Sequence, residues 1–396
     1  MILTRTTRLL VAGAAIALVS SPAFALDGND LFKKIVASVN LQPEDVQVAG
    51  IDVSGATVTL KGLSIADAKD GERMTVGDIV LEGVEEGSDG GYAISKAVFP
   101  NVNSTQEDTT ITASDLYFAN VSIPGSAGGP NVDSFLFYER GHAGPVTVTV
   151  KGKQVASIRE TTANLERADD NSGISFDTLV DGVTADLSVV DDPKSLETIQ
   201  SLGLTTINGK ISMQGSWEAE PGTINVDEYA LDFADVGRLN MSFSLSGYTI
   251  GFIKSAQETA RASEANPDKE AAKQAAGLAM LGLLQQLTFN NAEISFEDAG
   301  ITKRGLDYAG KSQGVSGQQM AMMVKGMAPL MLAQLNLPTL QTSLSAAINT
   351  FIDNPRNLTI TAEPPKPIPL PMIIGAAQAA PNTLPDMLGV TVTANE

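Results

Sequence analysis

The chain has 396 residues, 43% of them hydrophobic, and a formal net charge of −20 at pH 7. This length and apolar content supply a sizeable core and exclude a globally disordered chain. The negative charge disfavours nucleic acid and anionic lipid head groups, so any membrane contact has to be apolar and local. The chain has no cysteine and a single histidine, His142, which excludes disulfides, thiolate chemistry and an ordinary zinc site. His142 lies in a glycine-rich stretch, residues 141–145, and is therefore expected to be a surface turn residue.

The N-terminus is organised like a secretory signal peptide. Arg5 and Arg8 form its positive region, residues 9–19 its apolar core, and an Ala-Phe-Ala triplet at residues 23–25 its cleavage site. The apolar run is too short to span a bilayer, which favours cleavage near Leu26 over an uncleaved anchor. We therefore expect a periplasmic protein exported by the general secretion route, with secretion as the alternative.

A short helix is expected directly after the signal peptide, over residues 27–40. Its apolar residues fall on one face, and Asn29 or Asp30 can cap its start. We expect this helix to cover one end of a sheet, because a membrane-surface helix would have a longer apolar stripe and more lysines. The apolar face consists of Phe32, Ile35, Val36 and Val39.

The segment from Thr57 to Ile65 predicts a strand with one apolar face. Val58 and Leu60 alternate with polar residues, and at Gly62 the alternation changes phase, because Leu63 follows where a polar residue was due. A glycine with positive φ allows a bulge there without exposing the apolar side. The same pattern recurs at residues 79–84, 116–121, 243–248 and 294–299, with Gly83, Asn120, Gly247 and Asp298 at the glycine position.

Residues 46–253 read as strands almost throughout, because short alternating runs are separated by clusters of turn-forming residues. Parallel crossovers would require helical stretches that this region lacks, so the strands are expected to form antiparallel meanders. Many kinked strands with one apolar face build a curved sheet with an apolar concave side.

Helical patterns dominate the C-terminal part. Residues 255–287 are expected to be helical, and within them Asn266 can serve as a cap with Pro267 at the first helical position after it. A strand over residues 292–296 follows, and the chain returns to helix from Thr302. Ser316 and Gln319 have capping-box spacing and open a helix over residues 316–335 in which Pro329 produces a bend.

Methionines dominate one face of this helix. Methionine adapts to irregular partners, so the face is expected to serve either as a lipid-facing lid or as packing against the sheet. The candidate lid residues are Met320, Met323, Met327 and Met331. A further helix over residues 339–352, a strand over 358–361, a proline-rich connector over 364–371 and an edge strand over 390–392 complete the chain.

Residues 232–245 combine a strand, an acidic turn, Val236-Gly237 and a second strand. With the signal peptide, the kinked strands and the C-terminal helices, this organisation resembles the AsmA-like and DUF945-like envelope proteins of Gram-negative bacteria. The resemblance covers the β region and part of the helical end, and it implies a long β-groove with lipid as cargo. The chain is much shorter than the larger AsmA-like proteins and has no clear membrane anchor, so a bridge between two membranes is not implied.

The sequence offers no catalytic constellation. Residues 310–314 match the sequence motif of a nucleophile elbow. That motif requires a strand before the serine and a histidine after it, but here a helical pattern precedes the serine and His142 comes earlier in the chain. Acidic residues such as Asp169 and Asp191 do not have the spacing of a calcium loop, and phosphate-binding glycine motifs are missing. We therefore expect a non-enzymatic protein without cofactor or metal.

These patterns predict a β-rich α+β fold: a curved, mostly antiparallel sheet of the β-groove or β-taco type, a short N-terminal helix and a C-terminal helical cluster. The expected units are a signal peptide (1–25), a helix and β region (26–254), a helical region with interspersed strand (255–362) and a proline-rich connector and tail (363–396). The predicted function is to bind or pass a phospholipid or fatty acid; the alternative is a structural or protein-interaction β-protein with a filled core. The candidate groove residues are Val58, Leu60, Ile79, Leu81, Leu116, Phe118, Phe243, Leu245, Ile294 and Phe296.

Overall fold

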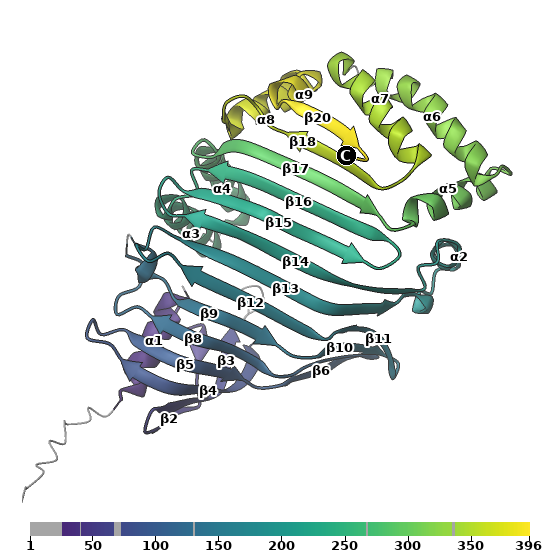
Figure 1. Cartoon of the computed structure of the whole chain (residues 1–396). Helices are drawn as coiled ribbons and strands as arrows, with labels where there is room; N and C mark the ends of the chain where they lie inside the picture. The colour runs from purple at the N-terminus through teal and green to yellow at the C-terminus, as the bar shows by residue number, and fades with distance from the viewer. Residues whose placement is uncertain (1–25, 40, 67–72, 130, 267, 335–336) are drawn as a thin grey trace, which may run out of the picture.

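The structure is a computed structural model that describes residues 26–39, 41–66, 73–129, 131–266, 268–334 and 337–396. The expected signal peptide, residues 1–25, lies outside the described residues. Within them, 44% of the chain is strand and 33% is helix. Figure 1 shows one large curved sheet with helices at its two ends and behind it. The predicted fold class is therefore confirmed.

All strands of the described chain belong to one sheet, and every pairing between them is antiparallel. The strands are β1 (Val46–Gln47), β2 (Gly50–Ser54), β3 (Thr57–Ala66), β4 (Arg73–Glu86), β5 (Tyr92–Phe99), β6 (Val102–Gln106), β7 (Thr109–Ala113), β8 (Leu116–Ile123), β9 (Phe137–Ala143), β10 (Val146–Val150), β11 (Lys153–Ile158), β12 (Glu160–Arg167), β13 (Gly173–Asp186), β14 (Thr206–Glu218), β15 (Thr223–Phe233), β16 (Gly237–Ser246), β17 (Thr288–Asp298), β18 (Asn357–Ala362), β19 (Ile368–Pro369) and β20 (Val390–Ala394).

The sheet is a meander in which the chain returns at each turn to pair with the strand before it. The pairings run from β2 through β3, β4, β5, β8, β9 and β12 to β13, and from there through β14, β15, β16, β17 and β18 to β20. The short strands β6, β7, β10 and β11 prolong β5, β8, β9 and β12 and pair among themselves. The expected strands over residues 292–296 and 358–361 are confirmed as β17 and β18, so the sheet continues through the helical region.

Several strands change phase at residues with positive φ, as the sequence pattern predicted. Gly62 has φ +57°, and both Leu60 before it and Leu63 after it are buried. Gly83 has φ +63° between the buried Leu81 and Val84, and Asn120 has φ +51°. The other two members of the pattern end strands: Gly247 follows β16, and Asp298 accepts hydrogen bonds from the Gly300 and Thr302 N–H groups at the start of a helix.

The two faces of the sheet differ in chemistry. Direct cross-strand partners share a face, and one row of such partners crosses the whole sheet with almost purely apolar side chains. We call the side that carries this row the apolar face and the other side the polar face. The row consists of Val58, Leu81, Ala97, Phe118, Gly141, Ala163, Thr178, Met213, Tyr229, Met241, Ile294, Ile360 and Val392.

Helix α1 (Gly28–Ser38) packs on the apolar face at the N-terminal end of the sheet. Its residues Leu31 and Val36 are buried in one cluster with apolar residues of β3, β4, β5 and β8. The cap is Asp27, whose side chain accepts from the N–H groups of Asn29 and Asp30, so the expectation that Asn29 or Asp30 caps the helix was wrong. Asp27 directly precedes the first helical residue, which places its carboxylate within reach of these free N–H groups.

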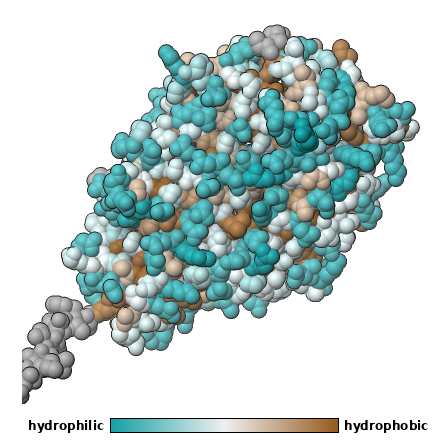
Figure 2. Space-filling view, viewed as in Figure 1, coloured by the Kyte–Doolittle hydropathy of each residue, from teal (hydrophilic) through white to brown (hydrophobic). Residues whose placement is uncertain are grey.

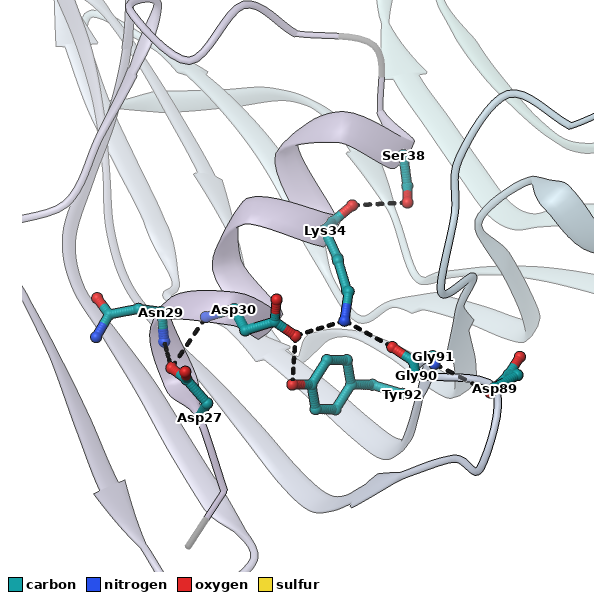
Figure 3. Close-up of polar contacts among 9 residues, drawn as sticks. All are labelled: Asp27, Asn29, Asp30, Lys34, Ser38, Asp89, Gly90, Gly91 and Tyr92. Carbon is teal, nitrogen blue, oxygen red and sulfur yellow. Dashed lines mark hydrogen bonds and ion pairs between the residues drawn. The ribbon is translucent and has the colours of Figure 1, made fainter.

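Figure 3 shows how side chains fix α1 to the sheet. The Lys34 ammonium donates to the Asp30 carboxylate and, at 2.7 Å, to the backbone oxygen of Gly90 in the β4–β5 turn. The Tyr92 hydroxyl of β5 donates to the same carboxylate at 2.8 Å. These hydrogen bonds lower the pKa of Asp30, that from Lys34 contributing most, while burial and then Asp30 itself raise the pKa of Tyr92.

Three helices differ from the sequence expectation. Helix α2 (Pro193–Ser201) interrupts the region that we expected to be β throughout; Asp192 caps it and Pro193 opens it. In place of one helix over residues 255–287, α3 (Ile250–Ala265) and α4 (Lys269–Leu284) form a pair. Asp268 rather than Asn266 caps α4, because Asn266 already ends α3.

The C-terminal helices are α5 (Ile301–Ser312), α6 (Gly317–Gln334), α7 (Pro338–Asp353), α8 (Leu370–Ala379) and α9 (Leu384–Met387). The capping box of α6 is confirmed, because Ser316 N–H donates to the Gln319 side chain and Gln319 N–H donates to Ser316 Oγ. Helix α7 lies beside the edge strand β20 (Figure 1), and the ring of its Phe351 contacts that of Phe296 on β17, with centroids 6.4 Å apart. The expected edge strand over residues 390–392 is confirmed as β20, whereas residues 370–387, expected as connector and tail, form α8 and α9.

Candidate functional site: the apolar face of the sheet

All ten candidate groove residues lie on the apolar face, although they come from five different strands. Four of them, on β3 and β4, are covered by α1 and are 7% exposed or less: Val58, Leu60, Ile79 and Leu81. These four belong to a filled core. The structure therefore offers no open surface at this end of the sheet, where the sequence suggested part of a groove.

The other six candidates lie beyond α1. Phe118, Phe243 and Ile294 are exposed, at 36%, 37% and 47%, while Leu116, Leu245 and Phe296 are half-buried. Met213, Tyr229 and Ile360 of the same cross-strand row are also exposed, at 36%, 38% and 40%. The middle of the apolar face is thus accessible from β8 to β18.

Helices border this open area. At one end α1 packs on β3 to β8, and at the other end Phe351 of α7 packs on Phe296. Along the side where β13 and β14 begin and end, Ile250 at the start of α3 packs with Val132 and Ala219 against Trp217 and Ile174. We call this open area, with the sheet as its floor and helices at both ends, the groove.

A distinct pocket of about 350 Å³ lies in the groove next to the α1 core. Small residues form its floor and rings form its wall: the Phe118 ring stands 5.5 Å from Phe99 and 4.5 Å from Tyr138, centroid to centroid. The pocket is lined by Phe99, Leu116, Tyr117, Phe118, Gly141, His142, Ala143, Thr161 and Ala163. Its lining suits an aliphatic chain, because shape and burial rather than hydrogen bonds would hold the ligand.

A larger pocket, of about 830 Å³, lies among the C-terminal helices. All four candidate lid methionines line it, with Val324, Ala328 and Leu332 of α6 and Ile348 of α7. Met320 is 5% exposed and is therefore a packing residue, whereas Met323, Met327 and Met331 are 41%, 51% and 61% exposed. The methionine face is thus buried at the first of its turns and exposed at the later ones. Ile348 lies one turn before Phe351, so these two residues are neighbours on the same side of α7.

The polar face carries hydrogen-bonded and charged side chains, and Figure 2 shows that hydrophilic residues cover most of it. Arg238 of β16 donates to Glu228 of β15 at 2.8 Å, and Ser212 of β14 donates to the same carboxylate. The Ser212 hydrogen bond is the main cause of a lowered pKa of Glu228. Ser244 bonds Asn225 at 2.7 Å and also accepts from Asn290. These contacts satisfy polar groups locally and do not converge on a cleft.

His142 is not the surface turn residue that the sequence suggested. It lies in β9, its side chain is 10% exposed, and its ring stacks on Tyr117 with centroids 4.7 Å apart. Nε2 lies 3.0 Å from the Asp115 carboxylate on the polar face. The Gly-rich spelling around it predicted a loop, but Gly141 is needed here for a close approach of Phe118.

Among the described residues, acidic and histidine side chains do not gather into a group that could hold a metal ion. In the same part of the chain, each helix is either too short or too polar to cross a membrane.

A protein-family model described as "Uncharacterized protein" matches residues 230–395. The match begins in β15 and includes the C-terminal half of the apolar face together with α3 to α9. A search of curated proteins gives no match.

Sequence reasoning missed several residues of the groove. Met213 and Ile360 stand between polar neighbours as the candidates do, but β14 lacks the kink pattern that we followed, and Ile360 sits in a short strand. Period-two alternation alone would have found these two. It would not have found Tyr229, because the apolar Ala230 follows it and β15 is irregular between Val226 and Tyr229.

Proposed function

We propose that the chain is an exported, non-enzymatic envelope protein that holds or passes an apolar ligand, a phospholipid or a fatty acid, in the groove. The export part rests on the N-terminal sequence pattern. The ligand part rests on one observation: the row of apolar residues from Phe118 to Ile360 remains accessible although it crosses the middle of the sheet.

An exposed apolar area of this kind is costly unless something covers it. Burying an isoleucine or phenylalanine side chain fully is worth about 1.5–3 kcal/mol, and continuous apolar patches mark interaction sites. An acyl chain fits the groove because it needs no hydrogen-bond partner, and the row offers only the Thr178 and Tyr229 hydroxyls. The adaptable methionines beside the groove suit ligands of variable shape.

Two measurements test the proposal directly. Organic extraction of gently purified protein, followed by mass spectrometry, is expected to release lipid in stoichiometric amount. Trp217, the single tryptophan, lies on the apolar face, so a brominated phospholipid or fatty acid in the groove is expected to quench its fluorescence. A clean extract together with unquenched Trp217 contradicts the proposal and favours a protein partner on this face.

A pair of double variants localises the ligand. Ile294 and Ile360 are direct partners on the apolar face, and Ser295 and Thr359 are the adjacent partners on the polar face. Ile294→Gln with Ile360→Gln is expected to weaken binding roughly 10- to 30-fold, since each exposed side chain loses about 1 kcal/mol of burial. Ser295→Gln with Thr359→Gln leaves binding unchanged. Equal effects of the two pairs would place the ligand elsewhere.

A further inference from the structure

Among the described residues of β12 to β18, one cationic side chain occupies a position on the apolar face. The acidic Asp298 also has such a position, at the end of β17, but it accepts from the N–H groups of Gly300 and Thr302. Apolar-face positions in these strands are occupied by Thr161, Ala163, Leu165, Arg167, Ile174, Phe176, Thr178, Val180, Ile211, Met213, Gly215, Trp217, Ile224, Val226, Tyr229, Leu231, Leu239, Met241, Phe243, Leu245, Ala292, Ile294, Phe296, Leu358, Ile360 and Ala362. Arg167 is the exception. It ends β12 and pairs with Ile174, next to Trp217.

The Arg167 guanidinium lacks a counter-ion within the described part of the chain. Its Nε and Nη2 atoms are buried there without a hydrogen-bond partner, and its carbon Cζ lies 4.5 Å from the ring centroid of Phe137. Acidic side chains are close by: Glu166, Asp169 and Glu218 line, with Arg167, a polar hollow of about 480 Å³ at the β12–β13 turn. Arg167 forms no ion pair with these carboxylates in the described structure.

The contact with the Phe137 ring is itself favourable, but it provides no acceptor for the buried Nε and Nη2 donors, and leaving such donors unsatisfied is unfavourable. Arginine binds carboxylate and phosphate groups through two parallel hydrogen bonds, so an anion would satisfy them. The position suits the head of an amphiphile. From Arg167 the apolar side of β12 leads through Leu165 to Ala163 in the pocket beside Phe118, about 13 Å away at 3.3 Å per residue.

We propose that Arg167 binds the anionic head group of an acyl lipid whose chain runs along β12 toward the Phe118 pocket. The ligand class is thereby narrowed to amphiphiles with one carboxylate or phosphate head. This inference rests on the proposed function, since it requires a lipid in the groove. It also reconciles an anionic ligand with a chain of net charge −20, because the single cation stands inside the groove and not on the acidic surface.

The test compares a fluorescent fatty acid, cis-parinaric acid, with its methyl ester, which has the same chain and no charge. The full-length mature protein is expected to bind the acid roughly tenfold or more tightly than the ester, the range of a charge-assisted hydrogen-bonded pair. Arg167→Gln is expected to reduce the affinity for the acid to that for the ester and to leave the ester unchanged. Arg140→Gln is the matched control, because Arg140 is exposed on the polar face of the neighbouring β9 and the charge change is the same.

The outcomes separate the two proposals. If acid and ester bind the wild type equally, or if Arg167→Gln weakens both equally, the head-group role of Arg167 is overturned while binding in the groove stands. If Arg140→Gln weakens the acid as much as Arg167→Gln does, the effect is one of net charge and the proposal also fails. Millimolar inorganic phosphate is expected not to displace the acid; displacement would show a free-anion site instead. If neither probe binds and brominated lipid leaves Trp217 unquenched, the proposed function itself fails.

Discussion

The ring of Phe118 lies over Gly141, its direct partner on the neighbouring strand, so closely that a Cβ atom at Gly141 would stand 3.1 Å from the ring. The glycine therefore gives the ring its position, and the ring forms the wall of the pocket in the groove. A larger residue at this position would both displace Phe118 and fill the pocket.

We expect Gly141→Val to weaken lipid binding and to destabilise the protein by about 1–3 kcal/mol, the usual cost of overpacking. Ala119→Val, which adds side-chain bulk on the opposite face of the adjacent strand, is the control and should leave binding unchanged. Titration with cis-parinaric acid and urea unfolding measure the two effects. Undiminished binding by Gly141→Val would show that the pocket does not hold the ligand.

Helix α6 permits a comparison between two methionines with different roles. Met320 is 5% exposed and Met331 is 61% exposed. Met320→Ala is expected to destabilise the protein by about 2–5 kcal/mol, whereas Met331→Ala should stay within about 0.5 kcal/mol of the wild type. Urea unfolding monitored by circular dichroism gives both values. Similar losses for the two variants would mean that the exposed end of the helix is also packing surface.

The contact between Phe351 and Phe296 is expected to hold α7 on the end of the groove. Phe351 is 8% exposed, so Phe351→Ala should cost about 3–5 kcal/mol locally. In Phe351→Ala, hydrogen exchange should accelerate in α7 and β20 while α1 keeps its protection. Phe351→Leu should retain most of the wild-type protection in α7 and β20. Uniform acceleration over the whole chain would argue that α7 does not open by itself.

The attachment of α1 predicts a pH dependence of stability. The pKa of Asp30 is lowered from its ordinary 3.8, chiefly by Lys34 and then by Tyr92, so its contribution is present above pH 3.8 and is lost as the pH falls through the lower native pKa. The pKa of Tyr92 is raised from 10.0 by burial and by Asp30, so its contribution is present below pH 10.0 and is lost as the pH rises through the higher native value.

The measurement is the difference in unfolding free energy between wild type and each of Asp30→Asn and Tyr92→Phe over the pH range. The Asp30 difference should be constant near neutrality and should shrink below about pH 4. The Tyr92 difference should persist from acid to neutral pH and should change above about pH 10. A difference that stays flat across both limits would show that the three side chains do not interact in solution.

The sequence predicted the chemistry of the faces better than their accessibility. Period-two alternation placed residues as far apart as Val58 and Phe296 on one side of the sheet, because side-chain direction is a local property of a strand. Whether a face is open depends on where helices dock, so the alternation could not show that α1 covers Val58 while Ile294 stays exposed. Arg167 escaped notice for a similar reason, since only the register with Ile174 and Trp217 reveals it as a charge on an apolar surface.

The meander topology also bears on how proteins of this architecture can change in length. Each strand pairs with its chain neighbours, so inserting or deleting one hairpin reroutes no other connection. Neighbouring strands are about 4.8 Å apart, and one hairpin therefore lengthens or shortens the sheet by about 10 Å. Evolution can thus match such a protein to a longer or shorter cargo by duplicating or losing whole hairpins, with both terminal caps retained.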